Sequence, residues 1–171
     1  MKNPAPAEHL PRLTRALAHL LAERRTGALA TLAEDGSPFV SLVPFALEPE
    51  RGWLVLHVSA LAEHAANLAA RPGVSLLIAQ GEVADAPVHA LARVSLQGRA
   101  LALEPGSTDW GDCRAAYLER FPEAEPMTHF ADFRFVAIEP VAARQVAGFG
   151  AARTLDAQEL RLALSAARSL P

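Results

Sequence analysis

The residues best placed to do chemistry lie where a predicted strand gives way to a predicted helix. In the stretch GWLVLHVSALAEHAANLAARPGVSLLIA, a strand is expected over residues 53–58 and a helix over about 60–69. Ser59 stands where a helix N-cap belongs, and Glu63 falls in the first turn, where the helix dipole favours negative charge. Unpaired backbone N–H groups at a helix start attract anions. We therefore predict a ligand site at this junction, although an ordinary capped helix would show the same pattern.

A second set of polar side chains follows one face of a long predicted strand, residues 89–103. Alternation places Arg93, Ser95, Gln97 and Arg99 on the same face, opposite Val94 and Leu96. Gly98 interrupts this alternation and predicts a bulge or a bend. Arg93 or Arg99 is a candidate for holding an anion, but the pattern favours a solvent-facing row of polar side chains.

Composition and charge limit the possible functions. The chain has 171 residues, which suits one domain, and its formal net charge of −3 comes without a basic stripe, so no nucleic-acid partner is expected. The single cysteine, Cys113, cannot form an internal disulfide and suits a reducing compartment. The N-terminus lacks the apolar core of a secretory signal, and no apolar run is long enough to cross a membrane. We expect a cytoplasmic protein without membrane association.

Turn signals and alternation indicate an antiparallel β protein. Asp35-Gly36 predicts a hairpin between strands at residues 28–32 and 39–45. Both faces of the strand 39–45 are largely apolar, so one face must meet a barrel interior and the other a helix or a partner subunit. Pro44 cannot donate to a strand ladder, which predicts a bulge or a strand end there.

The chain as a whole predicts a barrel with helices around it. An amphipathic helix is expected within residues 1–25 and a last helix within 154–171, where Asp156 and Glu159 form a capping box. Residues 26–153 then make the barrel core of a single domain, 1–171. We predict a mainly β (α+β) fold: an antiparallel barrel of six or seven strands with peripheral helices, paired as a two-fold homodimer.

Three segments carry a resemblance to a known family: VSLVPFALEPERGWLVLHVSALAEHAANLAARPGVSLLIA, then RVSLQGRA, then GFGAA. They resemble the FMN-binding split-barrel proteins related to pyridoxamine 5′-phosphate oxidase, and within these the HugZ-like branch associated with haem utilisation. The resemblance covers about residues 26–153. It implies a split β-barrel that works as a homodimer, with two flavin sites at the subunit interface.

The resemblance also implies which residues line each site. By position, Ser41, Leu42, Val43 and Pro44 would follow the flavin ring and ribityl chain, His57, Val58 and Ser59 would continue the pocket, Glu63 and His64 would face the phosphate, and Arg93 and Gln97 would reach the flavin from the long strand.

This sequence departs from the oxidases at the phosphate. The oxidases clamp it with an arginine and an arginine-lysine pair, whereas Ser41, Glu63 and His64 occupy those positions here. The oxidases' C-terminal substrate segment and the extra C-terminal domain of longer HugZ-like proteins have no evident counterpart. Pyridoxamine phosphate oxidase activity itself is therefore not expected.

Three functions remain open at this stage. The first is an FMN-dependent oxidoreductase acting on a small-molecule redox substrate, with unknown catalytic residues. The second is a protein that binds or degrades haem through a histidine ligand, for which His57, His64, His89 and His129 are candidates and His64 is favoured. The third is a non-catalytic dimeric binding protein. No other metal site is predicted, because the chain has no HExxH or CxxC motif.

Overall fold

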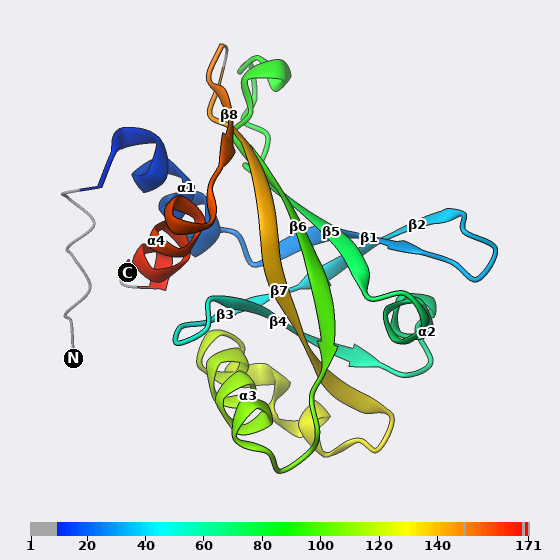
Figure 1. The fold of residues 1–171 in the computed structure, drawn as a ribbon. Helices are drawn as coiled ribbons and strands as arrows, with labels where there is room; N and C mark the ends of the chain where they lie inside the picture. Colours follow the sequence, from blue (N-terminus) through cyan, green and yellow to red (C-terminus); the bar gives the residue numbers. More distant parts are fainter. Residues whose placement is uncertain (1–9, 149, 169, 171) are drawn as a thin grey trace.

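The computed structural model describes residues 10–148, 150–168 and 170, which form one antiparallel sheet of eight strands with helices around it (Figure 1). The strands are β1 (Thr26–Leu32), β2 (Pro38–Pro44), β3 (Ala46–Glu48), β4 (Trp53–Ser59), β5 (Gly73–Ala79), β6 (Arg93–Ala102), β7 (Phe133–Val146) and β8 (Ala152–Leu155). The helices are α1 (Arg12–Glu23), α2 (Glu63–Ala70), α3 (Thr108–Arg120) and α4 (Ala157–Arg168), with 3-10 helices η2 (Val88–Ala90) and η3 (Pro122–His129). The first nine residues of the predicted segment 1–25, and Phe149 of the GFGAA segment, lie outside the described residues.

The sheet curls into a barrel because its two end strands are consecutive in the chain. The strand order is β2-β1-β5-β6-β7-β4-β3, and β8 pairs with β7 off this path. Only Phe45 separates β2 from β3, so one bent stretch of chain pairs with β1 on one side and with β4 on the other. Pro44 ends β2 as predicted, and the buried Phe45 donates its N–H to the carbonyl of Arg25. This arrangement confirms the split-barrel fold class.

A bulge in β6 lets the long strands bend. The register between β6 and β7 shifts between Gln97 and Gly98, as the sequence predicts. A Cβ atom on Gly98 would lie 2.7 Å from both the carbonyl oxygen of Glu139 and a side-chain carbon of Ile138. Glycine is therefore required where the two strands approach each other this closely. The predicted strand 89–103 is too long by several residues, because His89 lies in η2 and β6 begins at Arg93.

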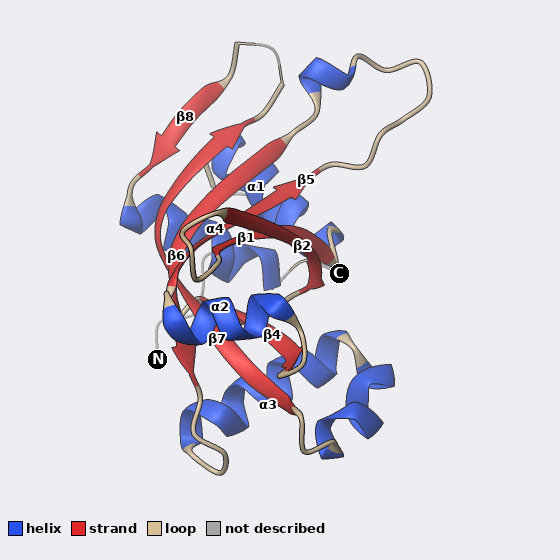
Figure 2. Ribbon diagram, turned by 90° about the vertical axis from the view of Figure 1, so that its right-hand side faces the viewer, coloured by secondary structure: helices blue, strands red, loops and turns tan. Residues whose placement is uncertain are grey.

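Two apolar cores lie on opposite sides of β4. The larger fills the barrel and reaches α1 and α4, and it includes Leu21, Leu56 and Leu164. The smaller lies between the sheet and α3, around Val55 and Tyr117. Figure 2 shows α3 below the sheet and α1 and α4 behind it, with α2 crossing in front of the strands. Side chains on the two faces of one strand therefore meet different environments.

The described residues leave the outer face of β2 uncovered. Val40 is 62% exposed and Leu42 is 75% exposed, whereas Val43 on the opposite face is buried. The prediction that both faces of this strand are covered thus holds within one chain only for the barrel side.

The division into a helical segment 1–25, a core 26–153 and a segment 154–171 stays a prediction. Among the described residues, no helix combines the length and the apolar composition needed to cross a lipid bilayer.

Candidate functional site

The junction between β4 and α2 is built differently from the sequence prediction. The helix begins at Glu63, and its N-cap residue, Ala62, makes no side-chain cap. The predicted N-cap role of Ser59 is therefore wrong. Its hydroxyl donates instead to a carboxylate oxygen of Asp132 at 2.8 Å and accepts the N–H of Leu61 at 3.2 Å. A backbone hydrogen bond from Ala60 to the carbonyl of Asp132 holds this turn in place, which delays the helix by one turn.

His64 and Ser41 form the one polar contact between the predicted site residues of β2 and α2. The Nδ1 atom of His64 lies 3.0 Å from the Ser41 hydroxyl oxygen. The imidazole is half-buried, and burial lowers its pKa, so the neutral form prevails at neutral pH. Within the described chain, the Nε2 atom has no hydrogen-bond partner. A neutral imidazole with one nitrogen held and the other free is suited to binding a metal centre.

The same junction does not fit a flavin phosphate. Glu63 is exposed at the start of α2, and the carboxylate of Asp132 lies beside Ser59. The cation on α2 is Arg71 at the other end of the helix, where it donates to the carbonyls of Ala33 and Glu34. A phosphate dianion beside two carboxylates, without an arginine or lysine, is electrostatically unfavourable. The predicted FMN phosphate site is therefore not supported by this geometry.

The predicted residues of β2 divide between the two faces of that strand. Val43 is buried in the barrel core, as is Val58 of β4. Leu42 and Pro44 lie on the exposed outer face of β2. Ser41 alone of the predicted β2 residues contacts His64, so the structure brings together only part of the predicted pocket.

Arg93 and Gln97 lie on the outer face of β6. Arg93 stands opposite Ala79 and Val146, and Gln97 opposite Ser75 and Ala142. Arg93 donates to the carbonyl of Leu91 at 3.1 Å. No hydrogen bond or ion pair in the described chain links these two residues to His64 or Ser41. Within one chain, the predicted site is thus two separate groups.

His57 lies on the α3 side of β4, away from His64. Its ring stacks on Phe135 at 4.4 Å between centroids, with Phe133 at 4.9 Å and Tyr117 at 5.7 Å. Burial lowers its pKa as well. Since three aromatic rings enclose the imidazole, His57 serves packing in the smaller core rather than a shared pocket with Ser41.

The remaining candidate histidines are less suited to bind iron. His129 places its Nε2 atom 2.8 Å from a carboxylate oxygen of Glu125 and is exposed, and His89 is exposed in η2. No group of three or more metal-ligating side chains occurs among the described residues. His64 is therefore the described histidine whose surroundings best suit a single-ligand site.

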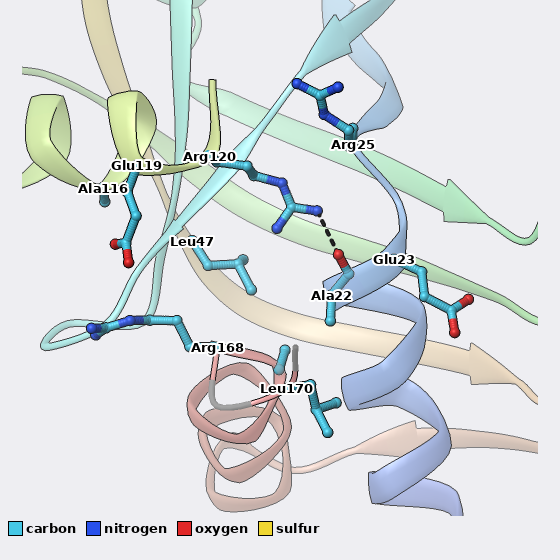
Figure 3. A pocket seen from close by; sticks show the side chains of 10 residues that line it. Ala22, Glu23, Arg25, Leu47, Ala116, Glu119, Arg120, Arg168 and Leu170 are labelled. Atoms are coloured by element: carbon cyan, nitrogen blue, oxygen red, sulfur yellow. Dashed lines mark hydrogen bonds between the residues drawn. The ribbon is translucent and has the colours of Figure 1, made fainter. Parts of the chain in front are cut away.

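A separate cavity of about 410 Å³ lies where the last turns of α1, α3 and α4 converge (Figure 3). Arg120 crosses it and donates through Nη2 to the carbonyls of Leu21, Ala22 and Arg24 at the end of α1. Cations at helix carboxyl ends compensate the helix dipole, so this arginine has a structural role. None of the predicted site residues lines this cavity.

Sequence reasoning missed two residues at the β4–α2 junction. Asp132 bonds to Ser59 from a position 73 residues away, and no local pattern marks it. Leu61 is 87% exposed, three residues before His64. A single exposed apolar side chain is common on protein surfaces, so Leu61 draws attention only through its place in the turn before His64. Its position in the predicted helix concealed it, because that helix begins later than expected.

Comparison with known proteins gives consistent results. A family model for pyridoxamine 5′-phosphate oxidase matches residues 13–147. Haem oxygenase HutZ of Vibrio cholerae is 32% identical over 139 residues, which cover 81% of this chain and 78% of HutZ. The chloroplastic haem oxygenase HOZ of Arabidopsis thaliana is 37% identical over 128 residues, covering 74% of this chain and 37% of HOZ.

Solved structures agree with the sequence matches. A haem-binding protein from Mycobacterium smegmatis superposes with a TM-score of 0.78 at 30% identity, over 89% of this chain and 61% of that protein. The crystal structure of HutZ superposes with a TM-score of 0.70 at 30% identity, over 76% of this chain and 91% of that one. The chain thus spans less than two thirds of the mycobacterial protein and of HOZ.

Proposed function

Since this chain belongs to the pyridoxamine 5′-phosphate oxidase-like split-barrel family, and its named relatives include haem oxygenases and a haem-binding protein, we propose that it binds haem and supports haem breakdown. The observation in the structure that carries the proposal is His64, a half-buried neutral imidazole with a free Nε2 atom. The alternative in which haem is the cofactor thus replaces FMN as the leading interpretation.

His64 would hold the haem iron, with Ser41 as its support. Ligation by Nε2 requires the proton on Nδ1, and the Ser41 hydroxyl at 3.0 Å is placed to accept that proton's hydrogen bond. The exposed Leu61 offers apolar surface nearby. Bound haem would supply an iron centre able to carry one-electron and dioxygen chemistry.

A second copy of the chain would complete the site. The predicted residues form two groups, one at the β2–α2 end and one on the outer face of β6. The outer face of β2 exposes Val40 and Leu42 in a single chain, and exposed apolar side chains of this kind favour burial against a partner. We therefore propose a homodimer in which the outer sheet faces take part.

The test is a pair of titrations on the purified protein. Haemin is expected to give a sharpened, shifted Soret band that saturates at one equivalent per chain at low micromolar concentration. FMN, titrated in parallel and followed by flavin fluorescence, is expected not to bind in that range. A Soret band that stays that of free haemin at tens of micromolar protein contradicts the proposal, and saturable FMN binding restores the flavin interpretation.

A further inference from the structure

The outer face of the sheet changes character from one side to the other. Cross-strand partners define two rows of side chains on this face. The first row is Leu42, Ala28, Leu77, Ser95 and Arg144, and the second is Val40, Ala30, Ser75, Gln97 and Ala142. The face is therefore apolar over β2, β1 and β5, and becomes polar and cationic over β6 and β7.

Arg144 lies in the first row, and no counter-ion accompanies it among the described residues. It is exposed on β7, between Ser95 of β6 and Thr154 of β8, and no carboxylate pairs with it in the described chain. Arg93 lies diagonally across from it, since Ser95 is the direct partner of Arg144 and Arg93 is two residues before Ser95. Diagonal neighbours on a sheet face are about 7–8 Å apart at Cα, so the two arginines belong to one region of this face.

Four other arginines of the described chain, Arg25, Arg51, Arg114 and Arg153, have carboxylate partners. Arg153 pairs with Glu159 at 2.5 Å, and Arg51 pairs with Asp109 at 2.6 Å. Arg99, on the same face as Arg93, stands opposite Glu139 in the strand register, and no ion pair joins the two side chains in the described chain. In the described chain, Arg93 donates to the carbonyl of Leu91 and pairs with no carboxylate. Two neighbouring cations without an anion repel each other, and a bound anion would remove that cost.

An apolar groove adjoins this cationic region. Its volume is about 440 Å³, and its lining includes Ala30, Leu32, Gln97 and Val141. Gln97 connects the two features, because it lines the groove and lies two residues from Ser95, the partner of Arg144. The face thus offers flat apolar surface next to paired cations.

We propose that Arg144, together with Arg93, binds the carboxylate groups of the ligand while its apolar body lies on the neighbouring sheet surface, with His64 supplied by the second copy of the proposed homodimer. The inference rests on the proposed function, since haem is a planar apolar molecule with two propionate groups. Arginine binds carboxylates through two parallel hydrogen bonds, which gives orientation as well as affinity. Arg144 is the specificity-determining residue of this pair, because it selects for the ligand's acid groups rather than for its ring or metal.

The test compares two iron-free porphyrins, so that metal ligation does not contribute. Protoporphyrin IX and its dimethyl ester are titrated against wild type, Arg144→Gln and the control Arg161→Gln, an exposed arginine of α4. Quenching of protein fluorescence and porphyrin emission report binding. Wild type and Arg161→Gln are expected to prefer the diacid by about tenfold or more, which is the usual strength of a charge-assisted hydrogen bond, and Arg144→Gln is expected to lose most of that preference.

The outcomes separate this inference from the proposed function. Equal affinity of wild type for the diacid and the ester overturns the inference and leaves haem binding intact, as does unchanged discrimination in Arg144→Gln. A shift of the Arg144→Gln variant in size-exclusion chromatography, with discrimination unchanged, assigns the residue to a subunit interface and also overturns the inference. Failure of wild type to bind either porphyrin, together with no haemin binding, overturns the proposed function and this inference with it.

Discussion

His57 and His64 lie seven residues apart and share the same half-buried state, yet their surroundings differ. The ring of His57 is enclosed by Phe133, Phe135 and Tyr117 in the core beneath α3. His64 stands at the start of α2, with Nδ1 held by Ser41 and Nε2 free. Burial lowers the pKa of both.

The difference shows that burial and a lowered pKa do not by themselves identify a functional histidine. A ring whose faces are covered by aromatic side chains contributes packing, and its replacement by another ring of similar shape preserves that contribution. A ring with one fixed and one free nitrogen contributes chemistry, and only a group that can ligate replaces it. Four predictions test this contrast.

The largest expected effect is on haem binding. His64→Ala removes the proposed iron ligand, so haemin affinity should fall by at least about tenfold and the Soret band should revert toward that of free haemin. His57→Phe is the matched control and should bind as wild type does. Haemin titrations followed by absorbance measure both variants. An unaltered spectrum in His64→Ala, or loss of binding in His57→Phe alone, reverses the roles of the two residues.

The second effect is on folding stability, where replacing His57 should have a larger effect than replacing His64. His57→Ala empties the space between Phe135 and Tyr117, so the free energy of unfolding should fall by about 2 kcal/mol, less than for a fully buried ring. His64→Ala should cost less than about 1 kcal/mol, because it loses mainly the contact with Ser41. Urea unfolding followed by circular dichroism gives both values. A larger loss for His64→Ala than for His57→Ala contradicts this assignment.

The third effect is an acid dependence of stability. The folded-state pKa of His57 lies below the unfolded value of about 6.5, because burial disfavours the charged ring. The contribution of neutral His57 to the free energy of unfolding is therefore complete above about pH 6.5. It is lost as the pH falls below that value toward the folded pKa. His57→Phe should lose less stability than wild type between pH 7.5 and pH 5. Unfolding curves measured at several pH values give the two free energies of unfolding. If these fall equally for both proteins over this range, His57 does not contribute to the acid dependence of stability.

The smallest effect concerns the support of His64. Ser41→Ala removes one hydrogen bond at 3.0 Å, worth about 0.5–1.5 kcal/mol, so haemin affinity should fall by roughly two- to tenfold. Ser41→Thr keeps a hydroxyl and should restore most of the affinity. Haemin titrations of the two variants provide the comparison. If Ser41→Ala binds haemin as tightly as wild type, the hydroxyl does not support the ligating ring.

Much of the fold could be predicted because its signals are local. The hairpin around Asp35-Gly36 joins β1 and β2, and Gly36 has a positive φ of 84°. The capping box before α4 is present, with Asp156 accepting the N–H groups of Gln158 and Glu159. Alternation also predicted which face of β6 is polar, and Gly98 marked its bulge. Each of these depends on residues only a few positions apart.

The candidate site was predicted less well because its contacts are long-range. Ser59 has the residue type of an N-cap, but a better partner, Asp132, comes from 73 residues away and takes its hydroxyl. Alternation along the strand shows which residues share a face with His57, but it does not show which of the two cores that face packs against. Leu61 falls in the first turn of the predicted helix 60–69, although it stands 87% exposed in the turn before α2. Local sequence propensity does not include contacts with residues that are distant in the sequence, and such contacts decided these positions.

By itself, the sequence determined the strands, the turns and the apolar faces that must be buried, since alternation and turn chemistry act between near neighbours along the chain. The tertiary structure alone decided which histidine keeps a free nitrogen and which arginines lack a counter-ion. Those outcomes depend on the curl of the sheet, which brings β2 against α2 and sets Arg144 beside β6. A hydrogen bond or an ion pair depends on the separation of two groups in space. For residues far apart in the sequence, that separation is set only when the barrel closes.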